Sequence, residues 1–369
     1  MKFSCEKLLL QTAVNTASRA AATKSSIPAL EGILIQAVDK LTISGFNMST
    51  GIRTTCEADI IEEGSLVLPA RLFGDIIRRL PDDVVTFDSN TNLNVNLTCG
   101  DASYNIMALS ADDYPELPEV EDQYSFHVSQ KVLRSMIKET SFAASTDESR
   151  PIHTGSLFEI TEENLTVVSV DGFRLALRRE PLAGVKGGTF NFVAPVAALN
   201  EVEKICDDVD EEAAIILGSR HLLFDVGNTQ LICRRLEGEF LDYKAAILRS
   251  NPITITADSK SLMNSIDRIS VVISEKQKSP IQCVFDSGKV TMSAKTSIGE
   301  SKDICPVEGD GKNLVIGFNN HYLMDALKYA PASNVRLELN TNISPCIILP
   351  AEGDENFLYM VLPVRLKSN

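Results

Sequence analysis

The chain has 369 residues, of which 44% are hydrophobic and 23% charged, and its formal net charge is −15. This length predicts two or three domains with cores of their own, and the composition is typical of a folded protein rather than a disordered one. No apolar run approaches the roughly 20 residues of a membrane span, and the first residues lack a signal-peptide pattern, so we expect a cytoplasmic protein that contacts no membrane. The acidic balance argues against nucleic-acid binding unless the basic side chains gather on one surface.

The spacing of the cysteines and histidines argues against a metal centre. The eight cysteines form no CxxC pair and the four histidines show no HxxxH spacing, so we expect free, mostly buried thiols and neither a metal nor a cofactor. The absence of P-loop, GxSxG and HExxH motifs argues against an enzyme. One catalytic alternative is a metal-dependent hydrolase, in which Asp112 and Asp113 of the acidic stretch 111–122 would converge with other carboxylates. We interpret this stretch as a linker.

The first third of the chain predicts a strand followed by a helix, a strand pair, a second helix and further strands, in that order. These elements are expected at residues 2–21, 30–47, 70–81 and 84–109. The first helix carries an apolar stripe of Leu9, Leu10, Ala13 and Val14. Pro81 ends the second helix, and the Pro-rich, acidic residues 115–123 have the composition of a linker.

The middle third repeats this order of elements. The corresponding segments are residues 125–144, 157–173, 195–208 and 213–236. The first helix has the same stripe spacing, with Val132, Leu133, Met136 and Ile137. Ser129 stands where an N-cap belongs, because its hydroxyl can accept a hydrogen bond from a backbone amide that the helix leaves free.

The last third repeats the order once more. Its segments are residues 253–274, 282–296, 320–331 and 335–364. Asp258 is the expected N-cap of the first helix, Leu262 and Ile266 form its stripe, and Pro331 ends the second helix.

Three similar copies predict an α+β protein with domains at residues 1–121, 122–250 and 251–369, each with two helices and antiparallel strands. If two such chains associate head to tail, about twelve helices can line a ring with a bore of roughly 28 Å, wide enough for a DNA duplex. This arithmetic shows only that the ring is feasible.

Several local motifs carry a resemblance to a known family. They are ADDYPELP (111–118), RPIHTGSLFEI (150–160), VDGFRLAL (170–177), EGEFLDYKAAI (237–247) and YMVLPVRL (359–366). Together with the order of elements over the whole chain, they resemble the bacterial DNA sliding clamps, the beta subunits of DNA polymerase III. The resemblance implies three clamp domains with helices inside and sheets outside, and a homodimeric ring that encircles duplex DNA without sequence specificity.

The resemblance also implies partners. They are the catalytic subunit of DNA polymerase III, the clamp loader and other replication and repair proteins, which the family binds through short peptide motifs to gain processivity. The alternative is a three-repeat, protein-binding adaptor that never encircles DNA, which the net charge of −15 favours.

In this family the DNA-facing groups are basic side chains on the inner helices and nearby loops. The matching residues are Lys24, Arg71, Arg78, Arg79, Lys131, Arg134, Lys138 and Arg150. Phosphate contacts of this kind are independent of base sequence, as a sliding ring requires. Each residue alone is equally consistent with an ordinary solvated charge. The second helix of the middle copy departs from the pattern, because Glu201 and Glu203 outnumber Lys204.

The family binds partner peptides in a cleft between its second and third domains. By resemblance, the walls of this cleft are Val170, Gly172, Phe173, Arg174, Leu175, Leu241, Asn319, Tyr322, Ile343, Met360, Val361, Leu362, Pro363 and Arg365. We expect Leu175, Val361 and Leu362 to receive apolar anchors, and Arg174 and Arg365 to hold carbonyl or carboxylate groups. An ordinary core strand at residues 359–364 is the alternative.

Three positions depart from the usual family residues. Leu241, Ala245 and His153 stand where the family often has proline, arginine and an apolar residue, which leaves the partner preference open. The family's ring seam joins an edge strand of the first domain to the third domain. Its counterparts are Tyr104 and Ile106 on one side and Val271 and Val272 on the other, although core packing would also explain these residues.

Overall fold

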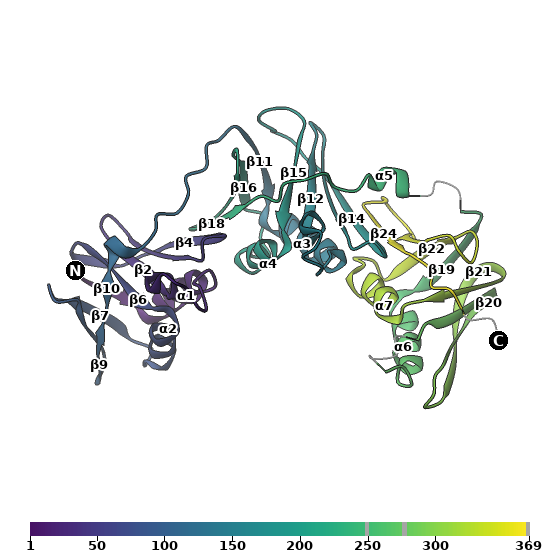
Figure 1. Cartoon of the computed structure of the whole chain (residues 1–369), viewed down its shortest axis with the longest axis horizontal. Coiled ribbons are helices and arrows are strands. Elements are labelled where there is room, and N and C mark those ends of the chain that lie inside the picture. Colours follow the sequence, from purple (N-terminus) through teal and green to yellow (C-terminus); the bar gives the residue numbers. More distant parts are fainter. Residues whose placement is uncertain (248–250, 275–278, 367–369) are drawn as a thin grey trace. The chain divides into compact units, whose positions relative to one another are not determined.

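A computed structural model describes residues 1–247, 251–274 and 279–366. The chain forms two compact units. The first contains residues 1–134, 183–188 and 197–235, and the second contains residues 135–182, 189–196 and the described residues from 236 onward. Figure 1 follows the order of their helices and strands along the chain. No helix within the described ranges is both long enough and apolar enough to cross a membrane.

The six predicted helices are present. They are α1 (Lys7–Ser18), α2 (Ala70–Arg79), α3 (Gln130–Thr140), α4 (Val196–Ile205), α6 (Ser259–Ser270) and α7 (Asn320–Tyr329), and a short α5 (Tyr243–Ala246) adds to them. Both predicted N-caps are confirmed. The Ser129 hydroxyl accepts a hydrogen bond from the Val132 amide at 3.3 Å, and the Asp258 carboxylate accepts one from the Ser261 amide at 2.7 Å.

The first unit contains two antiparallel sheets. The five-stranded sheet has the order β5 (Asp59–Glu62), β1 (Lys2–Glu6), β7 (Val84–Ser89), β8 (Asn94–Cys99), β9 (Ala102–Met107). The nine-stranded sheet has the order β10 (Leu109–Ser110), β6 (Gly64–Pro69), β2 (Gly32–Ala37), β3 (Leu41–Phe46), β4 (Thr50–Cys56), β18 (Thr229–Arg234), β17 (His221–Val226), β16 (Glu212–Leu217), β11 (Tyr124–Ser129).

Helices α1 and α2 supply part of one core of this unit. Leu10, Ala13 and Val14 are buried with side chains of α2 and of both sheets. The prediction for Leu9 is wrong, because this side chain is 40% exposed. Its neighbours on that side of α1 are polar: with Thr12 and Thr16 it lines a surface hollow. The buried stripe is therefore narrower than the sequence pattern indicated.

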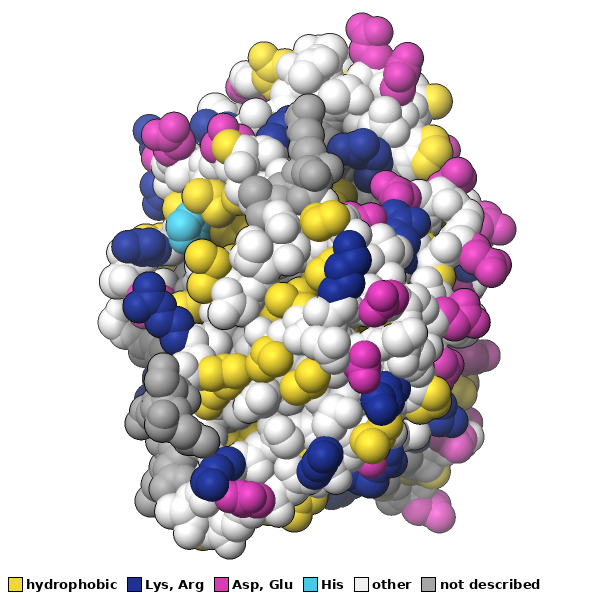
Figure 2. All heavy atoms as spheres, turned by 90° about the vertical axis from the view of Figure 1, so that its right-hand side faces the viewer, with side chains coloured by type: hydrophobic (Ala, Val, Ile, Leu, Met, Phe, Trp, Pro, Cys, Tyr) yellow, Lys and Arg dark blue, Asp and Glu magenta, His cyan; other side chains and the backbone are white. Residues whose placement is uncertain are grey.

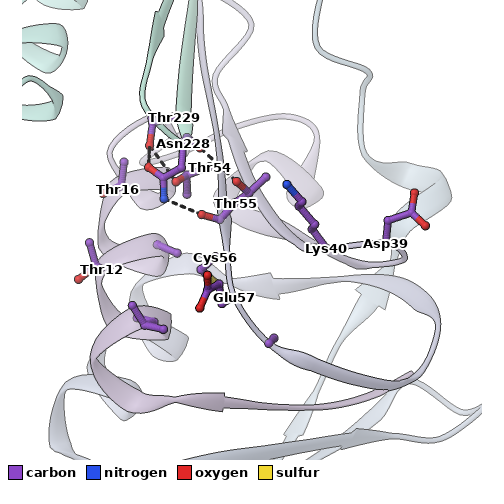
Figure 3. Close-up of a pocket in the computed structure, with 13 residues that line it drawn as sticks. Thr12, Thr16, Asp39, Lys40, Thr54, Thr55, Cys56, Glu57, Asn228 and Thr229 are labelled. Carbon is purple, nitrogen blue, oxygen red and sulfur yellow. Dashed lines mark hydrogen bonds between the residues drawn. The ribbon is translucent and has the colours of Figure 1, made fainter. Parts of the chain in front are cut away.

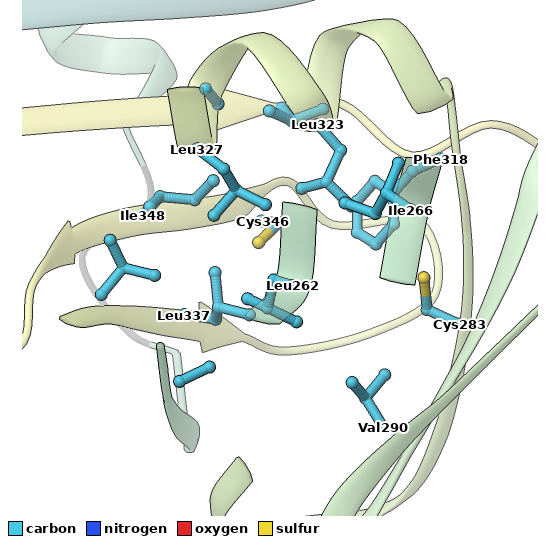
Figure 4. Packing of buried hydrophobic residues seen from close by; sticks show 14 of the residues in the cluster. Leu262, Ile266, Cys283, Val290, Phe318, Leu323, Leu327, Leu337, Cys346 and Ile348 are labelled. Atoms are coloured by element: carbon cyan, nitrogen blue, oxygen red, sulfur yellow. The ribbon is translucent and has the colours of Figure 1, made fainter. Parts of the chain in front are cut away.

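The second unit contains one ten-stranded sheet. Its order is β15 (Phe190–Pro195), β12 (Gly155–Ile160), β13 (Asn164–Val170), β14 (Arg174–Pro181), β24 (Phe357–Val361), β23 (Cys346–Pro350), β22 (Asn334–Leu339), β19 (Ile253–Asp258), β21 (Glu300–Phe318), β20 (Ile281–Lys295). Leu262 and Ile266 of α6 and Leu323 and Leu327 of α7 pack against its strands (Figure 4).

The strand pair expected at residues 282–296 is instead one long strand, β20, which pairs with β21 along most of its length. Residues 286–288, where the turn of such a pair would lie, form an irregularity in the ladder, and the register shifts twice there. Gly288 has a φ of +72°, and Gly309 on β21 has a φ of +112°. These conformations suit glycine, and they let the two strands continue past the bulge instead of turning back.

Two ladders join segments that the sequence assigns to different domains. Strand β4 pairs with β18 over five residue pairs, and β14 pairs with β24 over five. The described residues 114–123, around the expected boundary at 121, contain no helix or strand. The expected boundary at 250 lies outside the described residues.

Candidate functional sites

Basic side chains occupy one face of α2 and one face of α3. Arg71 and Arg78 are seven residues apart on α2, and Lys131, Arg134 and Lys138 follow the i, i+3, i+7 spacing on α3, so each set lies on a single helix face. All five side chains are exposed, whereas the opposite faces carry buried apolar residues. The amphipathic pattern that buries one face of each helix thus leaves the cations of the other face exposed to solvent.

The other predicted DNA-facing residues are also exposed. Arg79 lies at the end of α2, and Lys24 and Arg150 lie in loops. Two of the arginines are partly neutralised, because Arg78 forms an ion pair with Asp75 and Arg79 lies 3.6 Å from the same carboxylate. On α4, Glu201 lies 2.7 Å from Lys204 and 4.0 Å from Arg19, so this helix shows no comparable basic face.

Acidic side chains are unevenly distributed over the surface seen in Figure 2. Most Asp and Glu side chains there lie toward one edge and the top of the view, while Lys and Arg side chains are scattered among small hydrophobic groups. A net charge of −15 is therefore compatible with local basic surfaces.

The ladder between β14 and β24 forms the floor of a cleft of about 190 Å³ in the second unit. Eight of the predicted residues line it: Val170, Gly172, Phe173, Arg174, Leu175, Leu241, Met360 and Leu362. Gly172 has a φ of +88° and no heavy atom near the place of a Cβ, so the turn after β13 leaves space at the rim. The floor is apolar, because Val170, Leu175 and Met360 belong to a buried cluster.

Arg174 is held in place by its neighbours. Its Nε donates to Asp171 at 2.9 Å and its Nη1 donates to Asp325 at 2.6 Å. The guanidinium also lies 4.6 Å from the ring centre of Tyr322, which stacks on Phe173 with centroids 6.1 Å apart. Two carboxylates already neutralise this cation, so it acts as a rigid wall and is poorly suited to the predicted capture of a peptide carboxylate.

Six predicted cleft residues do not line the cavity itself. They are Asn319, Tyr322, Ile343, Val361, Pro363 and Arg365. Val361 follows Met360 on β24, and its side chain points into the core beneath α6 and α7, because successive strand residues face opposite sides. Asn319 instead caps α7 and accepts hydrogen bonds from the amides of His321 at 2.9 Å and Tyr322 at 3.4 Å.

Tyr322 borders the cleft through its stack with Phe173, and Ile343 and Arg365 are exposed. Sequence reasoning missed Ala246 and Pro345, which line the cavity. Ala246 lies within the motif at residues 237–247, and Pro345 lies close to Ile343, so proximity to predicted residues was the available signal.

The predicted seam residues lie on or near two edge strands, β9 and β20. Strand β9 is the edge of the five-stranded sheet and β20 is the edge of the ten-stranded sheet. On β9, Ile106 is buried in the core and Tyr104 is half-buried, while Met107, which sequence reasoning missed, is 67% exposed. The exposed apolar surface of β9 thus comes from Met107 more than from Ile106.

The other seam residues lie just after α6. Val271 is 80% exposed, and Val272 packs against the core. The Thr296 hydroxyl donates to the Val272 carbonyl at 2.9 Å, which ties the turn between β20 and β21 to this point. Ile298 in that turn is 72% exposed, so Val271 and Ile298 are apolar side chains presented at the same end of the unit.

Comparisons with known proteins cover the whole chain. The N-terminal, central and C-terminal domain models of the DNA polymerase III beta subunit match residues 1–118, 127–242 and 245–365. A Staphylococcus aureus protein named beta sliding clamp is 32% identical over 99% of both chains. The chain belongs to the DNA polymerase III beta subunit family, the DNA sliding clamps.

Solved structures of sliding clamps have the same fold. The sliding clamp of Bacillus subtilis is 29% identical over 100% of both chains, with a TM-score of 0.93. A DNA polymerase III beta subunit from Eubacterium rectale is 31% identical over 99% of both chains, with a TM-score of 0.92. The prediction of three clamp domains built from helices and antiparallel sheets is confirmed.

Sliding clamps are non-catalytic processivity factors of DNA replication, so the prediction that the chain is no enzyme is confirmed by family membership. The hydrolase alternative finds no support either. Within the described part of the chain, no group of three or more His, Cys, Asp or Glu side chains is placed to hold a metal ion. Near Asp112, the Ser110 hydroxyl accepts a hydrogen bond from the Asp112 amide at 3.3 Å, as a local turn requires.

The three departures from family residues have structural settings of their own. Leu241 is 43% exposed at the cleft, and Ala245 is exposed on α5. His153 makes an edge-to-face contact with Phe240 at 5.8 Å between ring centroids. Leucine at 241 leaves the backbone at this rim of the cleft less constrained than proline would, and Ala245 leaves α5 without the charge of an arginine.

Proposed function

We propose that two copies of this chain close head to tail into a ring that encircles duplex DNA without sequence specificity and tethers the replicative polymerase. The observation that carries this proposal is the match of all three domain models, in order, over nearly the whole chain. A tether of this kind needs an opening for DNA, a seam and a site for partners, and the chain offers residues suited to each. The adaptor alternative has no comparable support.

For DNA, the proposal uses the basic faces of α2 and α3 with Lys24 and Arg150. Their exposed cations can meet phosphates of any sequence, and such contacts weaken with salt, so they would not stop the ring from sliding. Retention would come from topology, which is consistent with a chain whose acidic residues outnumber its basic ones by 50 to 35.

For partners, the proposal uses the cleft of the second unit. Its apolar floor and the exposed ring of Phe173 suit short peptide motifs with apolar side chains, as expected for the polymerase subunit, the clamp loader and repair factors. Arg365 is exposed near the end of the described chain and is the more available cation, because Arg174 is paired.

For the seam, the proposal pairs edge strand β9 of one subunit with the β20 side of the other. Exposed edges with apolar side chains such as Met107 and Val271 are surfaces that a soluble protein normally covers. We further propose domain boundaries at residues 121 and 250, and the cytoplasm as the compartment. The cytoplasm keeps thiols reduced, and all eight cysteines are free.

Retention on circular DNA tests the proposal. Labelled protein would be placed on nicked circular plasmid by a bacterial clamp loader with ATP and purified by gel filtration. Half of the sample would then be cut once with a restriction enzyme. We expect co-elution with the circle and release from the linear form.

Protein that stays on both forms would indicate ordinary affinity rather than encirclement. Protein that binds neither form, although a related clamp of known activity loads in the same mixture, would overturn the proposal. Raising the salt concentration after loading separates the two kinds of binding further, since topological retention is insensitive to salt.

A further inference from the structure

Two cysteines far apart in the sequence meet in the first unit. Strand β1 pairs with β5 in a register that sets Ser4 opposite Asp59, so Cys5 lies next to the end of β4. The Cys5 sulfur lies 3.2 Å from the backbone oxygen of Glu57, the residue after Cys56. The Cys5 and Cys56 side chains lie near enough to perturb each other's pKa. Both belong to the core that also holds α1 and α2.

The start of α1 lies beside this pair. Cys5 precedes the helix by two residues, so its sulfur lies near the first turn of α1. The hydrogen bond with Cys56, and then that of Leu10, hold the pKa of the Cys5 thiol below its ordinary value. The same bond with Cys5, together with burial, raises the pKa of Cys56. A thiol with a lowered pKa, beside a second sulfur and a helix N-terminus, is a reactive arrangement.

Small molecules can reach the pair from one side. Cys56 is only partly buried and lines a surface hollow of about 750 Å³ between α1, β4 and the β17–β18 turn. In Figure 3, Cys56 and Glu57 lie together at this hollow, and Asn228 and Thr229 close another side of it. The hollow is held open by bonds of its own, including the Asn228 side-chain amide to the Thr55 carbonyl at 2.7 Å.

We propose that Cys5 and Cys56 form a redox-active pair that peroxides oxidise to an intramolecular disulfide. One thiol of the pair first loses its proton to solvent, and its sulfur attacks one oxygen of hydrogen peroxide. The O–O bond breaks, a sulfenic acid forms, and the departing hydroxide takes up the proton of the second thiol. The second sulfur then displaces the hydroxyl of the sulfenic acid as hydroxide, which takes back from solvent the proton that the first thiol released. Two thiols lose two electrons and two protons, and one peroxide becomes two waters.

Two buried cysteines of the second unit serve as an internal control. Cys283 and Cys346 both face the core beneath α6 and α7, where Figure 4 shows them among leucine and isoleucine side chains. Burial raises the pKa of the Cys283 thiol to about 12. Neither sulfur lines a surface hollow in the way Cys56 does, and no helix N-terminus activates them, so this pair stays reduced in the folded protein.

The test is thiol mapping of the full-length protein. Folded protein would be treated with dilute hydrogen peroxide, quenched, denatured, alkylated and digested without reduction. We expect six alkylated cysteines of the eight, and one linked peptide that joins Cys5 to Cys56 and disappears on reduction. The Cys56→Ser variant should yield no linked peptide, whereas Cys346→Ser should still form the Cys5–Cys56 link.

Two results would overturn the proposal. One is full alkylation of all eight cysteines after peroxide treatment that oxidises a reference thiol protein in the same tube. The other is linkage through Cys283 and Cys346 in folded protein, because that would show that enclosure and the helix terminus do not select the reactive pair. Wild-type protein alone gives both readouts, so the outcome is independent of whether a variant folds.

Discussion

At the scale of single residues, the cleft depends on how its charged and aromatic side chains are held. Arg174 is fixed by Asp171 and Asp325 and lies over Tyr322, so its contribution is the shape of a wall. Arg365 is exposed and lies beyond the last strand. The two arginines that the sequence presents as equivalent thus have different environments.

Arg365→Ala should weaken binding of a partner peptide about tenfold or more, because a hydrogen bond to a charged group contributes about 1.5–3 kcal/mol. Fluorescence anisotropy with a labelled peptide from a bacterial polymerase subunit would measure this. Lys289→Ala, which removes the same charge from the bulge of β20, is the control and should leave the affinity unchanged. Equal affinities for wild type and Arg365→Ala would exclude Arg365 from the cleft.

His221 should make the first unit sensitive to acid. Burial, then Arg234 and Arg220, lower the pKa of this imidazole. The unfolded chain therefore takes up the proton at a higher pH than the folded chain. The contribution of neutral His221 to the free energy of unfolding is complete above the ordinary histidine pKa, and it is lost as the pH falls below that value. His221→Gln should lose less stability than wild type between about pH 7.5 and about pH 5.5.

Urea midpoints followed by circular dichroism at both pH values would measure this difference. The matched control is His127→Gln, at an exposed position on β11 of the same unit. If His221→Gln and wild type lose equal stability on acidification, the histidine has no part in the pH response.

At the scale of elements, the N-cap of α7 joins fold stability to the cleft. Asn319 satisfies two amides of the first turn, one of which belongs to Tyr322, the ring that stacks on Phe173. The sequence resemblance places Asn319 in the cleft, whereas its contacts are those of a cap that orients a cleft residue. The N-terminus of α7 therefore sets the position of the Tyr322 ring beside the cleft.

Asn319→Ala should lower the free energy of unfolding by about 1 kcal/mol, the usual effect of removing an N-cap side chain. Chemical denaturation would show it as a lower urea midpoint. Asn319→Asp keeps an accepting oxygen and should restore most of the loss. An alanine variant as stable as wild type would mean that the cap contributes nothing to the folded state.

Much of the fold could be predicted from periodicity. Six helices, two N-caps and most strands follow from apolar spacing and capping residues, which are local signals. The structure differs from the prediction where distant strands decide. The glycine at 288 reads as a turn within its own segment, yet pairing with β21 makes it a bulge. Likewise Val361 and Met360 are both apolar, and only the sheet decides which one faces the cleft.

At the scale of the whole molecule, the acidic chain still presents its cations in groups. The basic faces of α2 and α3 arise because the opposite face of each helix is buried, so the spacing that buries one face also places the proposed DNA contacts on the other. The proposed seam, in contrast, depends on exposed apolar residues on β9 and just after α6, and it should be the feature most sensitive to an added charge.

Val271→Glu should convert the proposed dimer to monomer, because a carboxylate at this exposed apolar position would be buried in the seam without a partner. Sedimentation velocity or light scattering would show the mass of one chain instead of two, and retention on circular DNA should be lost. Ile343→Glu, at a 74% exposed apolar site near the cleft, should leave the mass unchanged. A Val271→Glu variant of dimeric mass would remove this residue from the seam.

The ladders β4–β18 and β14–β24 have a consequence for any attempt to divide the chain. A separation of the chain at each proposed domain boundary would leave one strand of the ladder, such as β18 or β24, with unpaired backbone amides and carbonyls that face water. Exposed edge strands of this kind pair with strands of other molecules, and the protein then aggregates. We therefore expect isolated domains to express poorly and to aggregate. In the intact chain, neighbouring domains should unfold in a single cooperative step rather than one after another.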